Sequence, residues 1–227
     1  MKNKHFFLES NQLNFDNFAA DFLFDKLNNN KLILNIALSG GDTPLPILNL
    51  LKNKNLIWER LNFYLVDERC VKIDHPQSNY GNLNKHFFKH ITSESFPIVQ
   101  PNISFVDGID NYKRSIIKNV SRIKNGIPEF DLILLGMGDD GHMASLFPNT
   151  NGLKESKELV IFNKIPQLQS ERITLTYPVL LNAKEIIVIV KGDSKKKIIK
   201  ELYSNLSTDY PMQKIVDEFE NLHWLID

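Results

Sequence analysis

The sequence predicts an α/β protein with a doubly wound, mostly parallel sheet and helices on both faces of the sheet. Two runs of strand length, residues 131–135 and 185–190, are wholly apolar after their first residue, as in strands buried on both faces. Segments with helical spacing of apolar residues alternate with such runs along the chain, which is typical of parallel sheets. The composition does not shift along the 227 residues, so we expect one domain over residues 1–227.

The first half of the chain alternates expected helices and strands. Phenylalanines recur at helical spacing in the first helix, and a run of asparagines follows it. Thr43 and Pro44 are expected to be the N-cap and the first-turn proline of the second helix. In the fourth helix, Tyr112, Ile116 and Ile117 are expected to face the core. Helices are expected at residues 13–27, 44–52, 79–90 and 109–123, and strands at residues 32–38, 61–66 and 103–106, with the asparagines at 28–30.

The second half continues this alternation. Strands are expected at residues 131–135, 159–162, 172–176, 185–190 and 222–226, a helix at residues 194–205, and a short connector at residues 178–182. A glycine-rich turn follows the first of these strands, and His142 stands after the turn, where a helix can begin. In open α/β folds, ligands bind at the carboxyl ends of the strands, so His142 is expected at such an edge.

Composition excludes several classes of function. Lys plus Arg and Asp plus Glu balance at 27 each, which gives no electrostatic basis for binding nucleic acid or an anionic membrane. The single cysteine, Cys70, fits a reducing compartment. The amino-terminal residues show no signal-peptide pattern, and no run of about 18 apolar residues occurs, so we expect a cytoplasmic protein.

The segment SGGDTP, residues 39–44, is a candidate phosphate site. Gly40 and Gly41 let backbone N–H groups approach an anion, the following helix N-terminus adds partial positive charge, and the hydroxyls of Ser39 and Thr43 supply donors. A plain tight turn before a capped helix explains the same residues equally well. The segment is not a Walker A loop, because no Gly-Lys-Ser/Thr follows it.

The trio Asp67, Glu68 and Arg69 lies at the carboxyl end of the second expected strand. An Asp beside an Arg is often a structural ion pair, but the shared sheet edge favours a functional role for Asp67 and Arg69. Cys70 has no sequence feature that activates a nucleophile, so it is interpreted as a bystander.

The segment GMGDDG, residues 136–141, matches the dinucleotide fingerprint G-x-G-x-x-G. Asp139 and Asp140 place two negative charges where a pyrophosphate has to bind, which weakens that interpretation, although Glu155 and Glu158 lie near the expected distance for a ribose-binding acid. His142, just after these acids, is a candidate general base, or a helix-start residue bonded to a neighbour.

Two cations late in the chain are candidate phosphate ligands. Arg172 opens a strand and Lys195 follows Gly192 at a helix start, and each is also explained as an ordinary surface cation. Lys196 and Lys197 leave the choice of lysine open. A metal site has no support, because His86 and His90, at helical spacing, lie on a lysine-rich segment.

Together these segments resemble the 6-phosphogluconolactonase family, within the glucosamine-6-phosphate isomerase/6-phosphogluconolactonase superfamily. The matching pieces are LSGGDTP (38–44), VDERCV…DHPQSNYG (66–81), LLGMGDDGHMASLFP (134–148), RITLTYPVL (172–180) and KGDSKKK (191–197). The resemblance implies a modified Rossmann-like fold and hydrolysis of 6-phospho-D-glucono-1,5-lactone to 6-phospho-D-gluconate in the oxidative pentose phosphate pathway. It also implies no metal and no organic cofactor.

The resemblance further implies a division of roles. His142 acts as the general base, Arg69 stabilises developing charge or binds a substrate hydroxyl, and Asp67 orients Arg69 or His142. The substrate phosphate is bound by six residues: Ser39, Gly40, Gly41, Thr43, Arg172 and Lys195. The expected partner is a small sugar-phosphate lactone, with no nucleic acid and no membrane, and the chain is expected to be a monomer or a small homo-oligomer.

Three alternatives stay open at this point. An amino-sugar phosphate isomerase/deaminase belongs to the same superfamily. An NAD-dependent dehydrogenase fits the glycine pattern but not the two aspartates. A non-catalytic sugar-phosphate sensor is expected to carry a DNA-binding helix-turn-helix, for which this chain has neither room nor basic surface.

Overall fold

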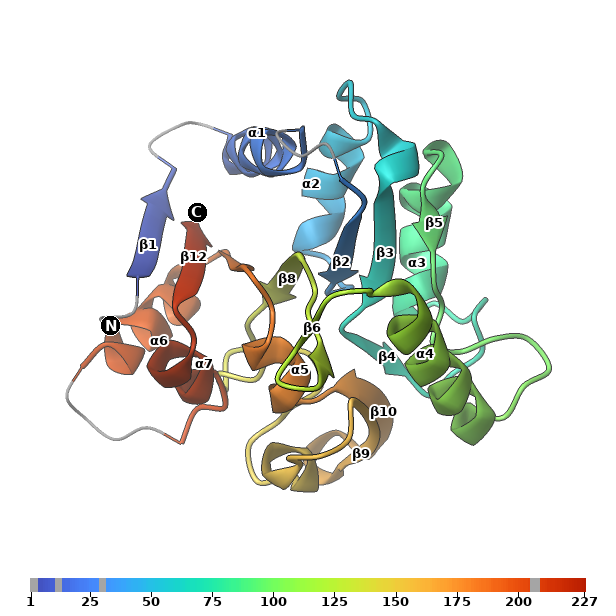
Figure 1. Cartoon of the computed structure of the whole chain (residues 1–227). Helices are drawn as coiled ribbons and strands as arrows, with labels where there is room; N and C mark the ends of the chain where they lie inside the picture. Colours follow the sequence, from blue (N-terminus) through green and yellow to red (C-terminus); the bar gives the residue numbers. More distant parts are fainter. Residues whose placement is uncertain (1–3, 11–13, 29–31, 205–208) are drawn as a thin grey trace.

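A seven-stranded parallel sheet runs through the centre of the protein in the order β1-β12-β11-β8-β2-β3-β5 (Figure 1). The computed structural model describes residues 4–10, 14–28, 32–204 and 209–227. The strands of this sheet are β1 (Lys4–Glu9), β2 (Leu34–Leu38), β3 (Leu61–Leu65), β5 (Glu94–Ser95), β8 (Leu132–Gly136), β11 (Ile186–Val190) and β12 (Asn221–Ile226). The predicted parallel α/β architecture is confirmed.

Helices flank this sheet, and two smaller sheets accompany it (Figure 1). The helices are α1 (Phe15–Asn28), α2 (Pro44–Leu51), α3 (Asn79–His86), α4 (Phe105–Asn119), α5 (Tyr177–Leu181), α6 (Asp193–Leu202) and α7 (Met212–Glu218), with short 3-10 helices η1 (Trp58–Arg60), η2 (Phe88–His90), η3 (Asn151–Lys154) and η4 (Pro166–Leu168). The strands β4 (Asp67–Arg69), β10 (Ser170–Leu175) and β9 (Val160–Ile165) form an antiparallel sheet, and β6 (Ile123–Lys124) pairs with β7 (Ile127–Pro128).

The central strands are apolar because both of their faces are covered. All five residues of β2 and of β11 are buried, and so are the first four residues of β8. This explains why these segments lack the alternation of a half-exposed strand. The Tyr112 hydroxyl donates to the Leu65 carbonyl and accepts from the Leu65 N–H, each at 2.7 Å, which satisfies the end of β3 where the chain leaves the central sheet.

The strand order reverses between β2 and β8. From β2 the chain adds β3 and then β5 on one side, whereas β8, β11 and β12 follow on the other side. The carboxyl ends of β2 and β8 therefore diverge into loops that leave in opposite directions. Open α/β sheets bind ligands at such a switch point, so we expect the ligand site at the residues that follow Leu38 and Leu135.

Three local expectations are wrong. The segment expected as a strand at residues 103–106 leads into α4 instead, because the Ser104 hydroxyl accepts a hydrogen bond from the Asp107 N–H at 3.1 Å and caps the helix. Ile117 is 59% exposed, whereas Tyr112 and Ile116 are buried as expected. The connector expected at residues 178–182 is mostly the helix α5.

Other boundaries also differ from the sequence expectations. The helix expected at residues 79–90 is divided into α3 and η2, while β1 and α7 have no counterpart in the sequence analysis. The expected helix ends at Leu13, Asn29, Asn30 and Asn205 lie outside the described residues. Across the described ranges, no helix is both long enough and apolar enough to span a bilayer.

Candidate active site

Loops from the switch point enclose a cavity of about 240 Å³ that holds eight of the nine predicted site residues. These are Ser39, Gly40, Gly41, Thr43, Asp67, Arg69, His142 and Lys195. The ninth, Arg172, does not line this cavity. It lines an adjoining cavity of about 530 Å³ that also contains Asp67, Arg69 and His142. The two cavities meet at these shared residues, so all the predicted side chains surround one bipartite cleft.

The turn after β2 is tied to the end of β8. The Ser39 N–H donates to the Leu134 carbonyl at 2.8 Å, and the Gly136 N–H donates to the Ser39 hydroxyl oxygen at 3.3 Å. Gly41 has φ of +93°, a conformation that favours glycine. The expected capping role of Thr43 is wrong, because its side chain makes no cap hydrogen bond to α2. Its hydroxyl is therefore not engaged in capping the helix beside the cavity.

A buried carboxylate fixes the segment after β3. The side chain of Glu68, completely buried, accepts hydrogen bonds from the backbone N–H groups of Arg69, Asn79 and Tyr80 and from the Ser78 hydroxyl. Burial raises the pKa of Glu68, and the backbone N–H donors oppose that rise. Glu68 therefore holds the start of α3 against β4 and, by the alternation of a strand, leaves its neighbours to line the cavity.

Asp67 is anchored on both of its carboxylate oxygens. The Ser145 hydroxyl donates to Oδ2 at 2.6 Å, and the Asn79 amide donates to Oδ1 at 3.2 Å. The ion pairs of the described residues do not join Asp67 to Arg69, which answers the structural alternative raised for this pair. The carboxylate that contacts His142 belongs to Asp140.

Arg69 and Arg172 are directly opposite each other on the antiparallel strands β4 and β10. Arg69 donates to the Gln77 carbonyl at 2.6 Å, and Arg172 donates through Nε to the Ser170 hydroxyl at 3.0 Å. Burial lowers the pKa of Arg172, and the charge of Arg69 lowers it further. The cavity that both arginines line also contains Asp67, Asp139 and Asp140, so the two guanidinium groups offer charge-assisted donors to a ligand without an excess of positive charge.

His142 is held from three sides on the loop that follows β8. Its Nδ1 lies 2.5 Å from Oδ1 of Asp140, and its ring stacks on Phe147 with centroids 3.8 Å apart. Gly138 leaves room for the imidazole, since a Cβ there meets ring atoms at 2.2 Å. The expected helix start at His142 is wrong: the chain turns tightly instead, with Ala144 at φ of +49°. The imidazole is therefore fixed by its own loop.

The structure also distinguishes among the three lysines at the start of α6. Lys195 lines the cavity with the turn after β2. Lys196 lies 3.8 Å from Asp193, and Lys197 lies 3.8 Å from Glu201, on other faces of the helix. The Ser194 hydroxyl donates to Asp139 at 2.9 Å, which links this helix start to the loop that carries His142.

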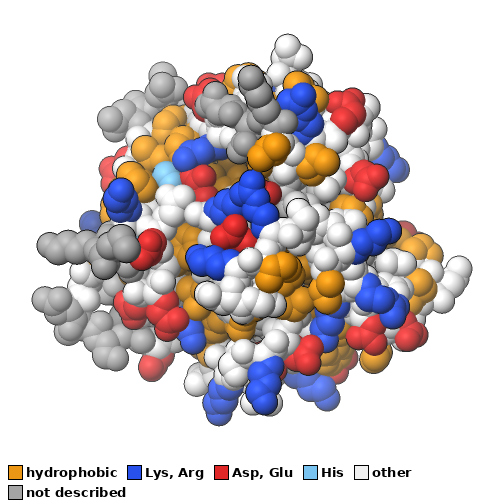
Figure 2. Space-filling model, viewed as in Figure 1, with side chains coloured by type: hydrophobic (Ala, Val, Ile, Leu, Met, Phe, Trp, Pro, Cys, Tyr) orange, Lys and Arg blue, Asp and Glu red, His pale blue; other side chains and the backbone are white. Residues whose placement is uncertain are grey.

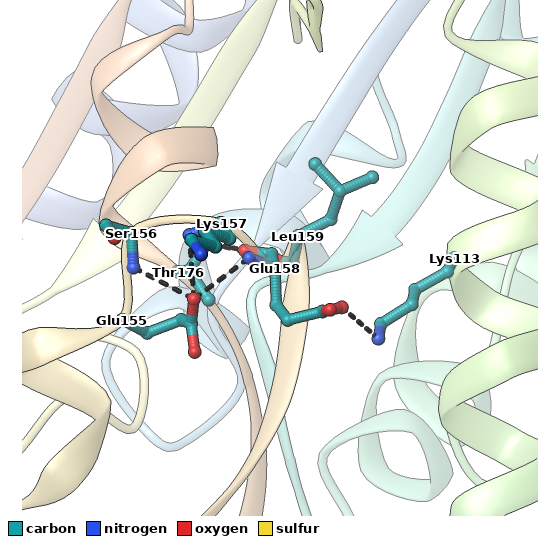
Figure 3. Close-up of polar contacts among 7 residues, drawn as sticks. All are labelled: Lys113, Glu155, Ser156, Lys157, Glu158, Leu159 and Thr176. Carbon is teal, nitrogen blue, oxygen red and sulfur yellow. Dashed lines mark hydrogen bonds and ion pairs between the residues drawn. The ribbon is translucent and has the colours of Figure 1, made fainter.

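The acids that weakly favoured a dinucleotide site have other contacts. The Glu155 carboxylate accepts from the N–H groups of the next three residues, and Glu158 pairs with Lys113 of α4 at 2.5 Å (Figure 3). The Thr176 hydroxyl donates to the Glu158 carbonyl at 2.6 Å (Figure 3). These contacts brace the loop before β9, so they supply a structural reason for both glutamates.

Basic and acidic side chains are interspersed on the face that Figure 2 shows, and the described residues there form no broad patch of one sign. Within the described ranges, no cluster of three or more His, Cys, Asp or Glu side chains has the arrangement of a metal site. In the pair His86 and His90, which the sequence did not favour as metal ligands, Nε2 of His90 lies 3.2 Å from the Lys85 carbonyl oxygen on the surface.

Sequence reasoning missed two residues of the cleft. Asp140 was considered as a charge that disfavours a pyrophosphate and as an acid just before His142, although its separation of two residues is a signal for a local contact. Asn79 lines the cavity from the first turn of α3, which lies far along the chain from the turn that it faces. Asn79 lies in the segment DHPQSNYG, which helped to carry the family resemblance, but nothing in that segment assigned a role to the asparagine.

Comparison with known proteins places this cleft in context. The family model described as "Glucosamine-6-phosphate isomerases/6-phosphogluconolactonase" matches residues 17–224. A 6-phosphogluconolactonase of Chlamydia pneumoniae is 35% identical over 199 residues, which cover 84% of this chain and 74% of that protein. A 6-phosphogluconolactonase of Haemophilus influenzae is 33% identical over 224 residues, which cover 93% of this chain and 91% of that protein.

Solved structures agree on the fold. The crystal structure of a 6-phosphogluconolactonase from Thermotoga maritima has a TM-score of 0.83 to this chain at 26% identity, covering 98% of this chain and 99% of that one. A monomeric glucosamine-6-phosphate deaminase has a TM-score of 0.79 at 21% identity, covering 98% of this chain and 97% of that one. The fold alone is therefore common to proteins named for two different reactions.

Proposed function

Because the chain belongs to the glucosamine-6-phosphate isomerase/6-phosphogluconolactonase family, we propose that its cleft hydrolyses 6-phospho-D-glucono-1,5-lactone to 6-phospho-D-gluconate as follows. The chain is a carboxylic-ester hydrolase, since curated relatives more than 30% identical over most of its length are named 6-phosphogluconolactonases. The observation that carries the mechanism is the placement of an Asp140-oriented His142 in the same cavity as the Ser39–Pro44 turn and Lys195.

In this proposal the substrate phosphate binds at the turn after β2. Gly40, Gly41 and Thr43 line the cavity beside the start of α2, where the helix dipole favours an anion, and Lys195 lines the same cavity and adds a positive charge. The Ser39 hydroxyl supports the turn through its bond to Gly136. Arg172 contributes from the adjoining cavity, so its contact with the phosphate is less direct than the sequence analysis assumed.

His142 is the proposed general base. Its Nδ1 proton is donated to Asp140, which leaves Nε2 free to take a proton from the water that attacks C1 of the lactone. The tetrahedral intermediate then collapses, the bond from C1 to the ring oxygen breaks, and Nε2 returns the proton to that oxygen. The product is a carboxylic acid, which loses its proton to solvent, and a free hydroxyl group.

Arg69 is the proposed electrostatic stabiliser. It lines both cavities together with His142, so it can approach the carbonyl oxygen on which negative charge develops. In this proposal Asp67 remains a fixed hydrogen-bond acceptor where the two cavities meet. Its carboxylate is bound by Ser145 and Asn79, whereas the expected partners were Arg69 or His142. Because a lactone is an activated ester, one base with good positioning is sufficient.

The remaining expectations are also proposals. We infer a cytoplasmic enzyme, from the single cysteine, that is one domain and works as a monomer or a small homo-oligomer on a small sugar-phosphate lactone. The proposed chemistry uses only protein side chains and water. Within the family, the relatives named lactonase favour hydrolysis over amino-sugar isomerisation and deamination.

The test is turnover of freshly generated 6-phosphogluconolactone, corrected for its spontaneous hydrolysis. Acceleration by the enzyme is expected, with no release of ammonia from glucosamine 6-phosphate in a parallel assay. A folded enzyme that leaves the spontaneous rate unchanged contradicts the proposal, and ammonia release in its place supports the deaminase alternative.

A further inference from the structure

The side-chain amide of Asn79 has a fixed orientation in the cleft. Asn79 is only 2% exposed, and its Nδ2 donates to the backbone carbonyl of Asp67 at 2.9 Å and to the Asp67 carboxylate at 3.2 Å. Both partners can only accept hydrogen bonds, so the nitrogen of the amide must face Asp67. The amide oxygen therefore points the other way.

That oxygen has no hydrogen-bond partner among the described residues, although it is buried. It lies against the turn after β2, because a Cβ on Gly40 meets it at 2.3 Å. Asn79 also lines the cavity that contains His142 and Lys195. A buried carbonyl oxygen without a donor is uncommon and is usually explained by a ligand or water that completes its bonding.

From this geometry we infer that Asn79 is a specificity-determining residue whose Oδ1 accepts a hydrogen bond from a hydroxyl group on the carbon chain of the substrate. The inference rests on the proposed function for the identity of the substrate. An acceptor repels phosphate and carboxylate oxygens, so it selects a group that carries a proton. The cavity then has donors at the Gly40–Thr43 turn and Lys195 and an acceptor at Asn79, which matches a polyhydroxylated phosphate ester.

The test combines changes in the protein with changes in the ligand. Calorimetry measures the binding of 6-phosphogluconate and of its 2-, 3- and 4-deoxy analogues to the wild type and to Asn79→Ala. In the wild type, one deoxy analogue is expected to bind about 10-fold more weakly than 6-phosphogluconate, the upper range for a neutral hydrogen bond. In Asn79→Ala, that same analogue and 6-phosphogluconate are expected to bind equally, because the partner of the hydroxyl is gone.

Ser145→Ala is the matched control. Ser145 donates the other side-chain hydrogen bond to Asp67 but does not line the cavity. It should retain the discrimination between hydroxyl and deoxy ligands. If Ser145→Ala abolishes the discrimination as Asn79→Ala does, Asn79 acts only through Asp67 and the inference is wrong.

Two further outcomes separate the inference from the proposed function. Loss of kcat in Asn79→Ala, with no coupling to any ligand hydroxyl, means that the oxygen binds the attacking water, which overturns the inference and leaves lactone hydrolysis standing. A wild type without lactonase activity whose ligand hydroxyl still couples to Asn79 contradicts the proposed function alone. If Asn79→Ala does not fold, Asn79→Ser replaces it. Its hydroxyl can still donate toward Asp67 but is too short to place an acceptor at the position of Oδ1, so the discrimination should be lost, and retained discrimination contradicts the inference.

Discussion

His142 and Asp140 contact each other within one short loop, with Nδ1 of the imidazole 2.5 Å from Oδ1 of the carboxylate. The Asp140 carboxylate also accepts from the backbone N–H of His142 at 3.2 Å. Because a carboxylate can only accept, the proton of the neutral imidazole is on Nδ1 and the lone pair is on Nε2. The loop therefore sets the tautomer of its own histidine, the proposed base, without a distant third residue.

Asp140→Asn is expected to lower kcat by about 10²-fold while KM changes little. The introduced amide can donate to Nδ1, which places the imidazole proton on Nε2 and removes the base. Steady-state kinetics on the lactone check this prediction. His142→Ala lacks the imidazole altogether, so its kcat is expected to fall by about 10²-fold or more and marks the lowest activity expected in this series. Asp139→Asn is the control, since Asp139 contacts Ser194 and not the imidazole. Equal kinetics for the two asparagine variants contradict the orienting role of Asp140.

Gly138→Ala is expected to reduce kcat in a protein that still folds. The added Cβ comes within 2.2 Å of Cε1 and Nδ1 of His142, so the imidazole has to leave its place on Phe147. For Gly136→Ala, at the last residue of β8, the added Cβ meets no atom within 4 Å. The methyl group of this control variant borders the cavity and can change KM, so the two variants are compared by kcat. A normal kcat for Gly138→Ala shows that activity does not require the observed position of the ring.

Lys195→Ala is expected to raise KM by about 10-fold or more, because a charge-assisted bond to phosphate is lost. Lys196→Ala removes the same charge from the next residue, which lies near Asp193 instead of the cavity, and should leave KM close to wild type. Arg172→Ala should also raise KM. If Lys195→Ala and Lys196→Ala behave alike, the phosphate does not bind where we place it.

Local sequence patterns predicted the fold correctly where each pattern has a direct structural cause. The buried runs at β8 and β11 were recognisable because strands covered on both faces must be apolar throughout. The residues after β2, β3 and β8 could be predicted to lie at one edge of the sheet, since the carboxyl ends of parallel strands share an edge. Arg172 could not be assigned to its cavity in this way, because its strand, β10, does not belong to the parallel sheet but pairs with β4 in a separate antiparallel sheet.

Other features depended on contacts between distant segments. The start of α4 was mistaken for a strand, because the apolar residues around Ser104 outweighed a short capping signal. The strand β1 is an edge strand with a mixed burial pattern, and only its pairing with β12 defines it. Asn79 belongs to the site through its packing against Gly40, a relationship that neither residue's neighbours in sequence reveal.

Cys70 is expected to be unreactive at neutral pH. Burial raises the pKa of its thiol to about 12, from an ordinary value of 9.0, and the nearby charges of Glu171 and Glu68 contribute to the rise. In the folded protein, alkylation by iodoacetamide should therefore rise about tenfold per pH unit past pH 9 without levelling. The chain has one cysteine, so mass spectrometry reports this site alone. The control is the protein in urea, where levelling near the ordinary pKa is expected; levelling there in the folded protein too contradicts the prediction.

Glu185 is expected to stabilise the fold only above its lowered pKa. Burial alone raises the pKa of this carboxyl, but Lys26 at 2.5 Å and His223 at 2.8 Å outweigh burial and lower it below its usual 4.5. The unfolded chain thus binds a proton on Glu185 more readily than the folded protein does. The contribution of Glu185 to the free energy of unfolding is therefore complete above about pH 5 and is lost as the pH falls through the folded pKa.

Glu185→Gln should lower the free energy of unfolding by about 2 kcal/mol near pH 7 and by much less near pH 3. Urea denaturation at both pH values measures this, and Glu171→Gln, from an exposed pair with Lys164, should have little effect at either. An equal cost of Glu185→Gln at both pH values shows that packing, and not charge, is what the substitution disturbs.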